Sequence, residues 1–447
     1  MFGRKKRKQE EEELAPHEMG PPVELSARGA DDEKNTQHLL RARQNMGIVT
    51  VKEVIADLAA HHADRAMLDL SPQSQSVTVR YDIDGAWHSQ EPKELQTAVG
   101  MLGIMKLISN LDVKDNRSRQ NGQFGAEYQN EKYDCKLTTQ GTENGGVRFI
   151  LELWNSKNEI NRPSPMGMRE EMLERYKELV AADSGLFIVS APPSHGGFTT
   201  TWISALGGTD RYMRDFVAVY DKEKIEPEVE NIDQVTYDLA AGETPEQVLN
   251  KLMLKQPEVL AFPEIKSSEL LNELLDLIVE DNICVFAGVR SKDAAEALLR
   301  LMQLKPDTQK FAQNVSFVLN TRLVRRLCNA CKQGFQPPQQ LLQKLGIPAG
   351  RVSVMHREWR PEDAETKKGQ DVEKCEKCAG LGYKGRIAIC ELLVIDDAIR
   401  EALVKQPQLE VIRKLAKKSG HATLQQEGIL LLTQGITSVN ELQRALK

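Results

Sequence analysis

The segment "LFIVSAPPSHGGFTTTWISAL", residues 186–206, joins an apolar run, a turn rich in Pro and Gly, a run of threonines and a second apolar stretch. This order predicts a strand, a tight loop and a helix, which is the layout of a phosphate-binding loop. Such a loop, G-x-x-x-x-G-K-[ST], uses its lysine on the terminal phosphates and its hydroxyl on Mg²⁺. Here the lysine position falls on Gly197 and the hydroxyl position on Phe198. The layout therefore indicates a nucleotide site, whereas the residues needed to hold a charged ligand are absent.

Strands and helices alternate around this segment, over residues 166–327. Apolar runs such as "DFVAVYD", "EVLAFPE" and "ICVFAGV" follow helical patterns, one of which begins with Thr244 as cap and Pro245 in its first turn. Strands that are apolar throughout predict a parallel sheet with helices on both faces, and hence an α/β class. Ligands of such sheets bind beyond the carboxyl ends of the strands, where the quoted loop is expected.

The rest of the chain divides by composition. Residues 1–35 carry "RKKRK", "EEEE" and little apolar sequence, which predicts a disordered charged tail. Residues 36–153 predict an α+β domain with a hairpin that turns at Asp84-Gly85 in "VRYDIDGAWHS", and residues 154–165 predict a linker. After residue 327 we expect a cysteine-bounded module over 328–390 and a C-terminal helical region over 391–447.

Composition limits the classes of function. The net charge of −6 argues against general nucleic-acid binding. No apolar run approaches the roughly 18 residues of a membrane span, and no apolar segment follows the N-terminal basic cluster as in a secretory signal. That cluster could contact anionic lipid, although a solvated tail is the simpler interpretation. Seven cysteines without such a signal indicate a reduced, cytosolic protein.

Two C-x-x-C pairs, "CNAC" and "CEKC", are the clearest chemical signal. They supply four thiolates, and four thiolates usually hold a tetrahedral structural Zn²⁺. The predicted ligands are Cys328, Cys331, Cys375 and Cys378. The long polar insertion between the pairs is unlike the simplest zinc ribbons, so redox thiols or a chance pairing remain the alternative. The other three cysteines lie in apolar strand patterns and are expected in the core: Cys135, Cys284 and Cys390.

Several segments together resemble the ATPases of type II secretion and type IV pilus assembly. "RLVRRLCNACK", "CEKCAGLGYKGRIAICELL" and "GHATLQQEGILLLTQGITSVNELQRAL" follow that family's order of Arg-rich helix, tetracysteine module and closing helices. "VTVRYDIDGAWH" and "LDVKDNRSRQNGQF" resemble its N-terminal hairpin and arginine-bearing loop. The resemblance covers residues 47–447.

The resemblance implies a RecA-like P-loop NTPase core, a PAS-like N-terminal domain, the zinc module and the C-terminal helices. It also implies cytoplasmic hexameric rings at the inner membrane, with peripheral membrane association left open. In that family nucleotide binds between the two domains, and hydrolysis drives pseudopilin assembly.

Mapped onto this sequence, the family's motifs are incomplete. Tyr220 stands where a catalytic Glu is expected, Arg290 replaces a histidine, and Lys136 and Glu152 replace nucleotide-facing arginines. Glu264 survives in a Walker-B-like motif as the candidate catalytic base, and Arg117 as a possible phosphate contact. The nucleotide-loop positions are Ser194, His195, Gly196, Gly197, Phe198, Thr199 and Thr200.

These concerted losses favour a motor-family protein with a degenerate nucleotide site. It would be a scaffold or regulatory subunit of a homo- or hetero-hexamer, beside motor-family subunits and cytoplasmic domains of inner-membrane platform proteins. The alternative is an active ATPase with a rewired site, using Thr199, Glu264 and Arg117 with Mg-ATP to power pilin assembly or secretion. A third hypothesis, nucleic-acid binding through the zinc module and "RLVRR", is disfavoured by the negative net charge and the lack of interleaved aromatics.

Overall fold

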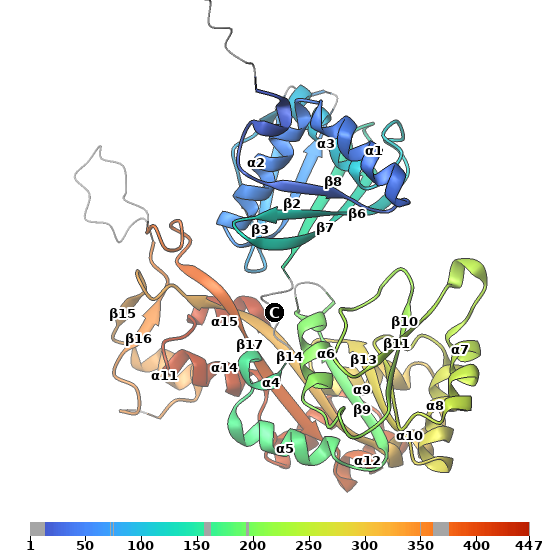
Figure 1. Ribbon diagram of the computed structural model, residues 1–447. Helices are drawn as coiled ribbons and strands as arrows, with labels where there is room; N and C mark the ends of the chain where they lie inside the picture. The colour runs from blue at the N-terminus through green and yellow to red at the C-terminus, as the bar shows by residue number, and fades with distance from the viewer. Residues whose placement is uncertain are drawn as a thin grey trace, which may run out of the picture. The chain divides into compact units, whose positions relative to one another are not determined.

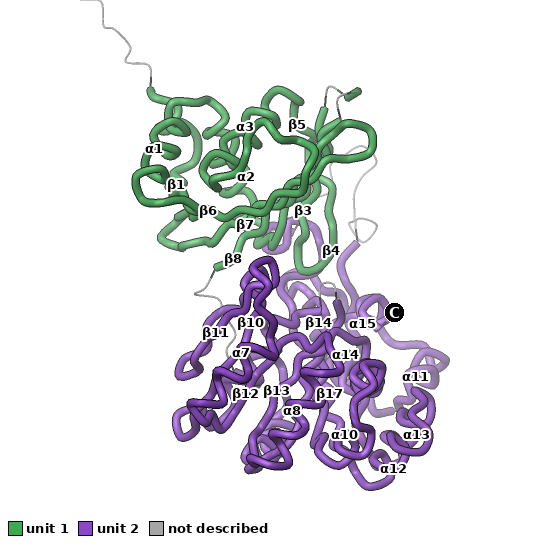
Figure 2. Tube along the Cα trace, turned by 90° about the vertical axis from the view of Figure 1, so that its right-hand side faces the viewer, with its two compact units in different colours: residues 1–159 green, residues 160–447 purple. Residues whose placement is uncertain are grey.

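The computed structural model describes residues 14–71, 73–74, 76–155, 162–193, 196–348, 350–360 and 375–446. The chain forms two compact units, residues 1–159 and 160–447 (Figure 2). Each unit has its own sheet and its own core, and each is described by itself.

The first unit is an antiparallel sheet with helices packed on one face (Figure 1). The strands run in the order β1-β6-β7-β8-β2-β3-β4, and β5 pairs with β3. The class is α+β as predicted, while the likeness to PAS domains stays a prediction. The elements are β1 (Glu24–Ala27), α1 (Asp32–Arg43), α2 (Gly47–Ala60), β2 (Ala63–Leu70), β3 (Ser76–Ile83), β4 (Ala86–Ser89), β5 (Lys93–Glu94), α3 (Leu95–Ile108), β6 (Gln120–Tyr128), β7 (Glu131–Gly141) and β8 (Val147–Trp154).

The predicted hairpin is confirmed between β3 and β4. Ile83 pairs with Ala86, so Asp84 and Gly85 form a two-residue turn. Both have positive φ, 53° and 78°, which matches the right-handed twist of the flanking strands.

The predicted disordered tail is wrong for residues 14–35. Glu24–Ala27 forms β1, which pairs antiparallel with β6, and Val23 and Leu25 are buried. The buried ammonium of Lys52 donates hydrogen bonds to the carbonyls of His17 and Met19. A short alternating pattern inside charged sequence was therefore sufficient for an edge strand, because β6 supplies the backbone partners. "RKKRK" and "EEEE" lie outside the described residues.

The second unit is built on a seven-stranded sheet of order β11-β10-β12-β13-β9-β14-β17. All neighbouring pairs are parallel except β14 with β17. The predicted parallel sheet is thus confirmed, with one antiparallel strand at its edge. The strands are β9 (Gly185–Ala191), β10 (Phe216–Asp221), β11 (Asp233–Tyr237), β12 (Val259–Phe262), β13 (Cys284–Arg290), β14 (Val315–Leu327) and β17 (Tyr383–Val394).

Helices cover both faces of this sheet, which explains why β9 is apolar throughout. Leu186 and Ile188 face one cluster of buried side chains, and Phe187, Val189 and Ala191 face the other. The first face carries α7 (Pro245–Leu252), α8 (Ser268–Glu280), α9 (Ala294–Met302), α10 (Thr308–Asn314), α12 (Asp397–Lys405) and α13 (Leu409–Lys418). The second carries α4 (Pro163–Met166), α5 (Glu170–Val180) and α6 (Phe198–Gly207).

The Arg-rich helix expected at "RLVRRL" is instead the end of β14. This strand pairs with β9 on one edge and with β17 on the other, and these backbone partners outweigh local helix propensity. The predicted boundary at residue 390 lies inside β17, so the cysteine module and the parallel sheet share a strand. The remaining elements are β15 (Gln333–Phe335), α11 (Gln339–Leu345), β16 (Met355–Arg357), α14 (Leu424–Thr433) and α15 (Val439–Leu446).

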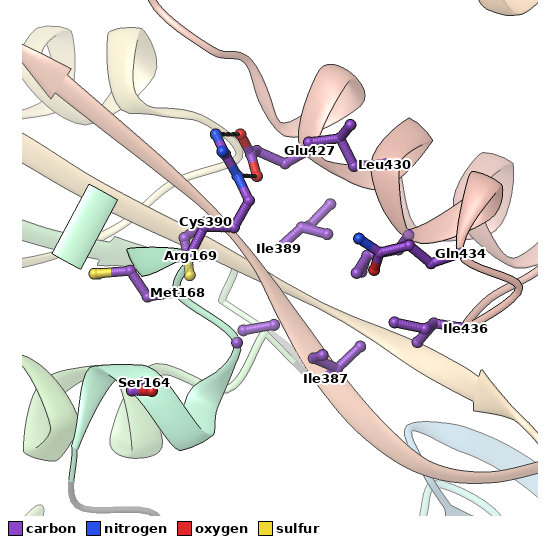
Figure 3. A pocket seen from close by; sticks show the side chains of 13 residues that line it. Ser164, Met168, Arg169, Ile387, Ile389, Cys390, Glu427, Leu430, Gln434 and Ile436 are labelled. Carbon is purple, nitrogen blue, oxygen red and sulfur yellow. Dashed lines mark hydrogen bonds and ion pairs between the residues drawn. The ribbon is translucent and has the colours of Figure 1, made fainter. Parts of the chain in front are cut away.

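A small pocket of about 240 Å³ lies where the segment before α5 meets β17 and α14 (Figure 3). At its edge Arg169 binds Glu427 through two hydrogen bonds, Nε to Oε2 at 2.8 Å and Nη2 to Oε1 at 2.7 Å. Glu427 is almost fully buried, so this pair ties the start of the second unit to α14. No helix of the described ranges has the length and apolar character that a membrane crossing requires.

Glu441 joins the C-terminal helix to β14. Its side chain is fully buried and accepts hydrogen bonds from Arg325 Nε at 2.8 Å, from the Arg325 backbone at 2.9 Å, and from Arg444 Nη2 at 2.6 Å. Burial raises the pKa of this carboxyl, but the two guanidinium groups lower it further, and the net pKa is below its ordinary value. A carboxyl with a lowered folded-state pKa stabilises the fold above its unfolded pKa and loses that contribution as pH falls.

We therefore expect Glu441→Ala to destabilise the second unit by about 3–5 kcal/mol at neutral pH, because two arginines lose a buried partner. Urea unfolding of the whole chain, followed by near-ultraviolet circular dichroism, measures the loss. The difference from wild type should shrink as the pH falls below about 4, because the unfolded chain then binds a proton at this glutamic acid that the folded carboxylate, with its lowered pKa, does not yet bind.

The matched control is Glu410→Ala, which removes an exposed carboxylate paired with Arg413 on α13. This change should leave the unfolding midpoint near that of wild type. Equal destabilisation by both substitutions would contradict the role given to Glu441.

Candidate functional site

The predicted phosphate loop lies between β9 and α6, at the carboxyl end of the sheet. Its last residue, Gly197, caps α6 with left-handed backbone angles, φ 75° and ψ 30°. A Cβ at position 197 would lie 2.8 Å from the Leu323 side chain, and a Cβ at Gly196 would collide with the carbonyl of Pro192. Both positions therefore require glycine in this conformation. Ser194 and His195 lie outside the described residues.

Buried hydroxyl and amide groups fix the strand ends beneath the loop. Asn320 Nδ2 donates to Ser190 Oγ at 2.9 Å, and the hydroxyls of Ser190 and Ser291 are 2.6 Å apart. Ser291 in turn donates to the carbonyl of Asp293 at 2.9 Å. This network joins the ends of β9 and β13 to the middle of β14. It was not anticipated from the sequence, because its members are far apart in the chain.

The threonines after the loop hold the first turn of α6. Thr201 Oγ1 donates to the carbonyl of Gly197 at 2.8 Å and contacts the hydroxyl of Thr321 at 2.5 Å. Thr199 and Thr200, which were predicted as nucleotide-loop residues, are half-buried in the same turn. The hydroxyl of Thr201 thus stabilises the loop itself.

An apolar ring, that of Phe198, lies where the sequence motif predicts a Mg²⁺-binding hydroxyl. Phe198 is 5% exposed and stacks on Trp202, with ring centroids 5.8 Å apart and planes 15° apart. The guanidinium carbon of Arg290 lies 3.3 Å from the centroid of the Phe198 ring. Gly288 is required beside this ring, because a Cβ there would lie 2.7 Å from it. Phe198 is consequently enclosed by a cation, an indole and the backbone of β13.

Arg290 is held in place from its other side by Glu226, at 3.5 Å. Burial lowers the pKa of the guanidinium, and the charge of Glu226 offsets part of that effect. Arginine stays charged at neutral pH despite such a shift. Arg290, which stands where the resemblance predicts a histidine, is therefore engaged in a cation–π contact and an ion pair.

Tyr220, at the position expected for a catalytic Glu, lies in the core. It is 1% exposed, and its hydroxyl accepts a hydrogen bond from Trp202 Nε1 at 3.3 Å. Burial raises its pKa to about 12, so it is a neutral phenol at neutral pH. Phe198 and Tyr220, which are far apart in the sequence, thus both contact Trp202, and Arg290 contacts Phe198. Trp202 and Glu226 were missed from the sequence, although Trp202 follows Phe198 by one helical turn.

Glu264, the candidate catalytic base, follows β12 at the same end of the sheet. Its carboxylate is 3.0 Å from Lys266 Nζ and 3.4 Å from Lys224 Nζ. Partial burial raises its pKa, but the two lysines lower it by more, so the net pKa is below the ordinary value. A carboxylate with a lowered pKa is a weak general base.

Arg117 belongs to the first unit and lies on an exposed loop that hydrogen bonds to Asp115 and Lys106 stabilise. The Asp115 carboxylate accepts the backbone N–H groups of Arg117 and Ser118, at 2.9 and 3.1 Å. The buried Lys106 ammonium donates to the Asp115 carbonyl at 2.6 Å and to Asn116 Oδ1 at 3.1 Å. The loop is thus preorganised to present Arg117.

The four predicted zinc ligands are brought together in the second unit. Their sulfur atoms all lie within 4.8 Å of one another, with Cys328 and Cys375 at 3.9 Å and Cys331 and Cys378 at 3.6 Å. Four sulfurs at 2.3 Å from a tetrahedral Zn²⁺ would be about 3.8 Å apart. The cluster therefore has the donors and the dimensions for a structural zinc. Cys135, Cys284 and Cys390 are buried, as expected for core residues.

Comparison with known proteins agrees with this architecture. The family model described as "Type II/IV secretion system protein" matches residues 42–444. The chain is 29% identical over 395 residues to the type IV pilus assembly ATPase PilB of Thermus thermophilus, covering 88% of this chain and 42% of that protein. It is 23% identical over 430 residues to type II secretion system protein E of Pseudomonas aeruginosa, covering 96% and 81%. The chain thus spans less than half of the Thermus relative.

Solved structures show a similar fold. The ATPase DotB of Legionella pneumophila superposes with a TM-score of 0.57 at 13% identity, covering 89% of this chain and 95% of that one. The pilus retraction motor PilT with bound ADP gives a TM-score of 0.51 at 15% identity, covering 88% and 95%. At these identities the likeness concerns the fold alone.

The cysteine geometry leads to a metal prediction. We expect the purified, reduced chain to contain one Zn²⁺ per molecule by elemental analysis, and Cys375→Ser to lose it, because three thiolates leave the tetrahedron incomplete. Chelation of wild-type protein should lower its melting temperature.

Cys135→Ala is the matched control, since it removes a buried thiol from the first unit. It should keep full zinc content whatever its effect on stability. Wild-type protein without metal, or unchanged zinc in Cys375→Ser, would refute the site.

Proposed function

Because the chain belongs to the Type II/IV secretion system protein family, we propose that it is a motor-family subunit with a degenerate nucleotide site. It acts as a scaffold or regulatory subunit of a cytoplasmic hexameric assembly-platform complex. The observation that carries this proposal is the packing of Phe198 between Arg290 and Trp202, at the place where a phosphate loop presents its Mg²⁺ hydroxyl.

The proposal rests first on what Mg-nucleotide needs. A phosphate loop neutralises the terminal phosphates with lysine and coordinates Mg²⁺ through a hydroxyl. Gly197 offers no charge, and Phe198 offers no oxygen. The partly exposed cation beside the ring, Arg290, already contacts Phe198 and is paired with Glu226. The loop keeps its backbone N–H groups and the start of α6, which alone favour an anion only weakly.

Hydrolysis would lack its acid–base groups as well. Tyr220 is a buried phenol hydrogen-bonded to Trp202. The negative charge of the Glu264 carboxylate is offset by ion pairs with Lys224 and Lys266. Without a bound metal or a polarised γ-phosphate, a water oriented by Glu264 has no activated electrophile.

A structural role is supported by what the chain retains. The seven-stranded sheet, both helical layers and the cysteine cluster are all complete in the described residues. Relatives are named as assembly and secretion proteins, and we extend that setting to this chain. Its partners would be further motor-family subunits, including an intact one, and cytoplasmic domains of inner-membrane platform proteins.

The second candidate function is an ATPase with a rewired site, which would power pilin assembly or secretion. The preorganised loop around Arg117 favours it, since a presented arginine is typical of a phosphate contact. Thr199 would then serve Mg²⁺ and Glu264 would orient water.

Nucleotide binding separates the two candidates. We expect titration calorimetry with millimolar Mg-ATP to give no saturable heat, and phosphate release to equal that of buffer. The control for trace contaminants is Glu264→Gln prepared in parallel. Turnover in wild type that Glu264→Gln abolishes would establish the rewired ATPase and remove the scaffold-only function.

The role of Arg290 gives a further prediction. If it is structural, Arg290→Ala should lower the stability of the second unit by about 0.5–1 kcal/mol, the range of a partly exposed cation–π contact. Lys292→Ala, at an exposed neighbouring position, is the control and should leave the melting temperature unchanged. An Arg290→Ala protein as stable as wild type that loses ATP binding would instead make Arg290 a ligand-binding residue.

A further inference from the structure

The second unit contains a positively charged pocket beside the cysteine cluster. Its volume is about 420 Å³, and four of its lining residues are cationic: Arg326, Lys377, Lys384 and Arg386. Within the part of the chain that the structure describes, no acidic residue lines it. The whole chain has a net charge of −6, so the charge of this pocket is opposite in sign to that of the chain. A concave site lined by one sign of charge concentrates ligands of the opposite sign.

Three of these cations are not neutralised within the described ranges. Arg326, Lys377 and Lys384 are exposed, and none of them forms an ion pair with a residue that the structure describes. The neighbouring Arg325 differs, because it is bound by Glu441 and covers the Tyr383 ring at 4.2 Å. The described residues therefore supply a carboxylate for Arg325 and none for Arg326, Lys377 or Lys384.

The cations are carried by rigid parts of the fold. Arg326 lies at the end of β14, and Lys384 and Arg386 lie on β17, which pairs with β14. Lys377 lies between Cys375 and Cys378, in a turn closed by a hydrogen bond from Cys378 N to the Cys375 carbonyl at 3.3 Å. Cys328 N donates to the Gly382 carbonyl at 3.0 Å and so joins the two walls. The backbone that carries these charges is thus already ordered before a ligand binds, which lowers the entropic cost of binding.

We propose that this pocket binds an acidic peptide segment of a protein partner, through successive Asp or Glu carboxylates. Guanidinium and ammonium groups both pair with carboxylates, and several pairs together compensate for the weakness of each exposed one. The described lining of the pocket has one large apolar side chain, Leu327, unlike a surface that inserts into lipid. The same described lining has no aromatic residue on which a nucleic-acid base could stack.

The test uses the full chain and a short fluorescein-labelled peptide that carries a run of glutamates. The same peptide with glutamines in place of the glutamates is the ligand control. Fluorescence anisotropy should show saturable binding of the acidic peptide, weakened by added salt, and none of the glutamine peptide. Charge reversal in Arg326→Glu with Lys384→Glu should weaken binding by about tenfold or more.

Lys414→Glu, on the exposed face of α13, is the matched charge control and should bind within about twofold of wild type. The neutralising pair Arg326→Gln with Lys384→Gln should give an intermediate loss, and melting curves of all variants show that they are folded. Equal binding of the glutamine peptide, or an equal loss in Lys414→Glu, would overturn the proposal. Tighter binding of single-stranded DNA or of anionic lipid vesicles than of the peptide would overturn the class of partner. None of these outcomes depends on nucleotide, so they are distinct from the test of the proposed function.

Discussion

The second unit depends on β14, which connects three parts of the structure through one strand. Its first half pairs with β9 and so belongs to the parallel sheet, and its whole length pairs with β17. Near its end Arg325 binds the buried Glu441, and the chain then continues into the first cysteine pair. Sheet, C-terminal helix and cysteine cluster are therefore parts of one mechanical body, although the sequence suggests separate modules.

The same strand order explains the content of the candidate site. β9, β13 and β14 are neighbours, so the residues that follow or end them meet at one edge of the sheet. Residues that are far apart in the sequence form a chain of contacts here: Arg290 covers Phe198, Phe198 stacks on Trp202, and Trp202 donates to Tyr220. The cation–π contact, the ring stacking and the hydrogen bond together stabilise these side chains as one packed cluster. On the proposed function, this cluster keeps the frame of a phosphate loop without its charged groups.

Much of this could be predicted from the sequence, for identifiable reasons. The strands of the parallel sheet were evident because they are apolar on both faces, and the cysteine ligands because their spacing is distinctive. The hairpin at Asp84-Gly85 followed from turn chemistry. β1 and the end of β14 were missed, because in both the deciding partner is a distant strand rather than a local pattern. The network of Ser190, Ser291 and Asn320 could not be found from sequence, since it joins three separate strands.

The left-handed backbone at Gly197 limits which residues this position can accept. A side chain at this position meets Leu323 and adopts an unfavourable φ, so a lysine cannot be restored by one substitution without first re-forming the turn. A hydroxyl at 198 would in turn leave Arg290 without its ring and Trp202 without its stacking partner. Each of these substitutions is unfavourable while the other residues of the cluster remain. On the proposed function, a working phosphate loop would therefore need several coordinated changes at this site.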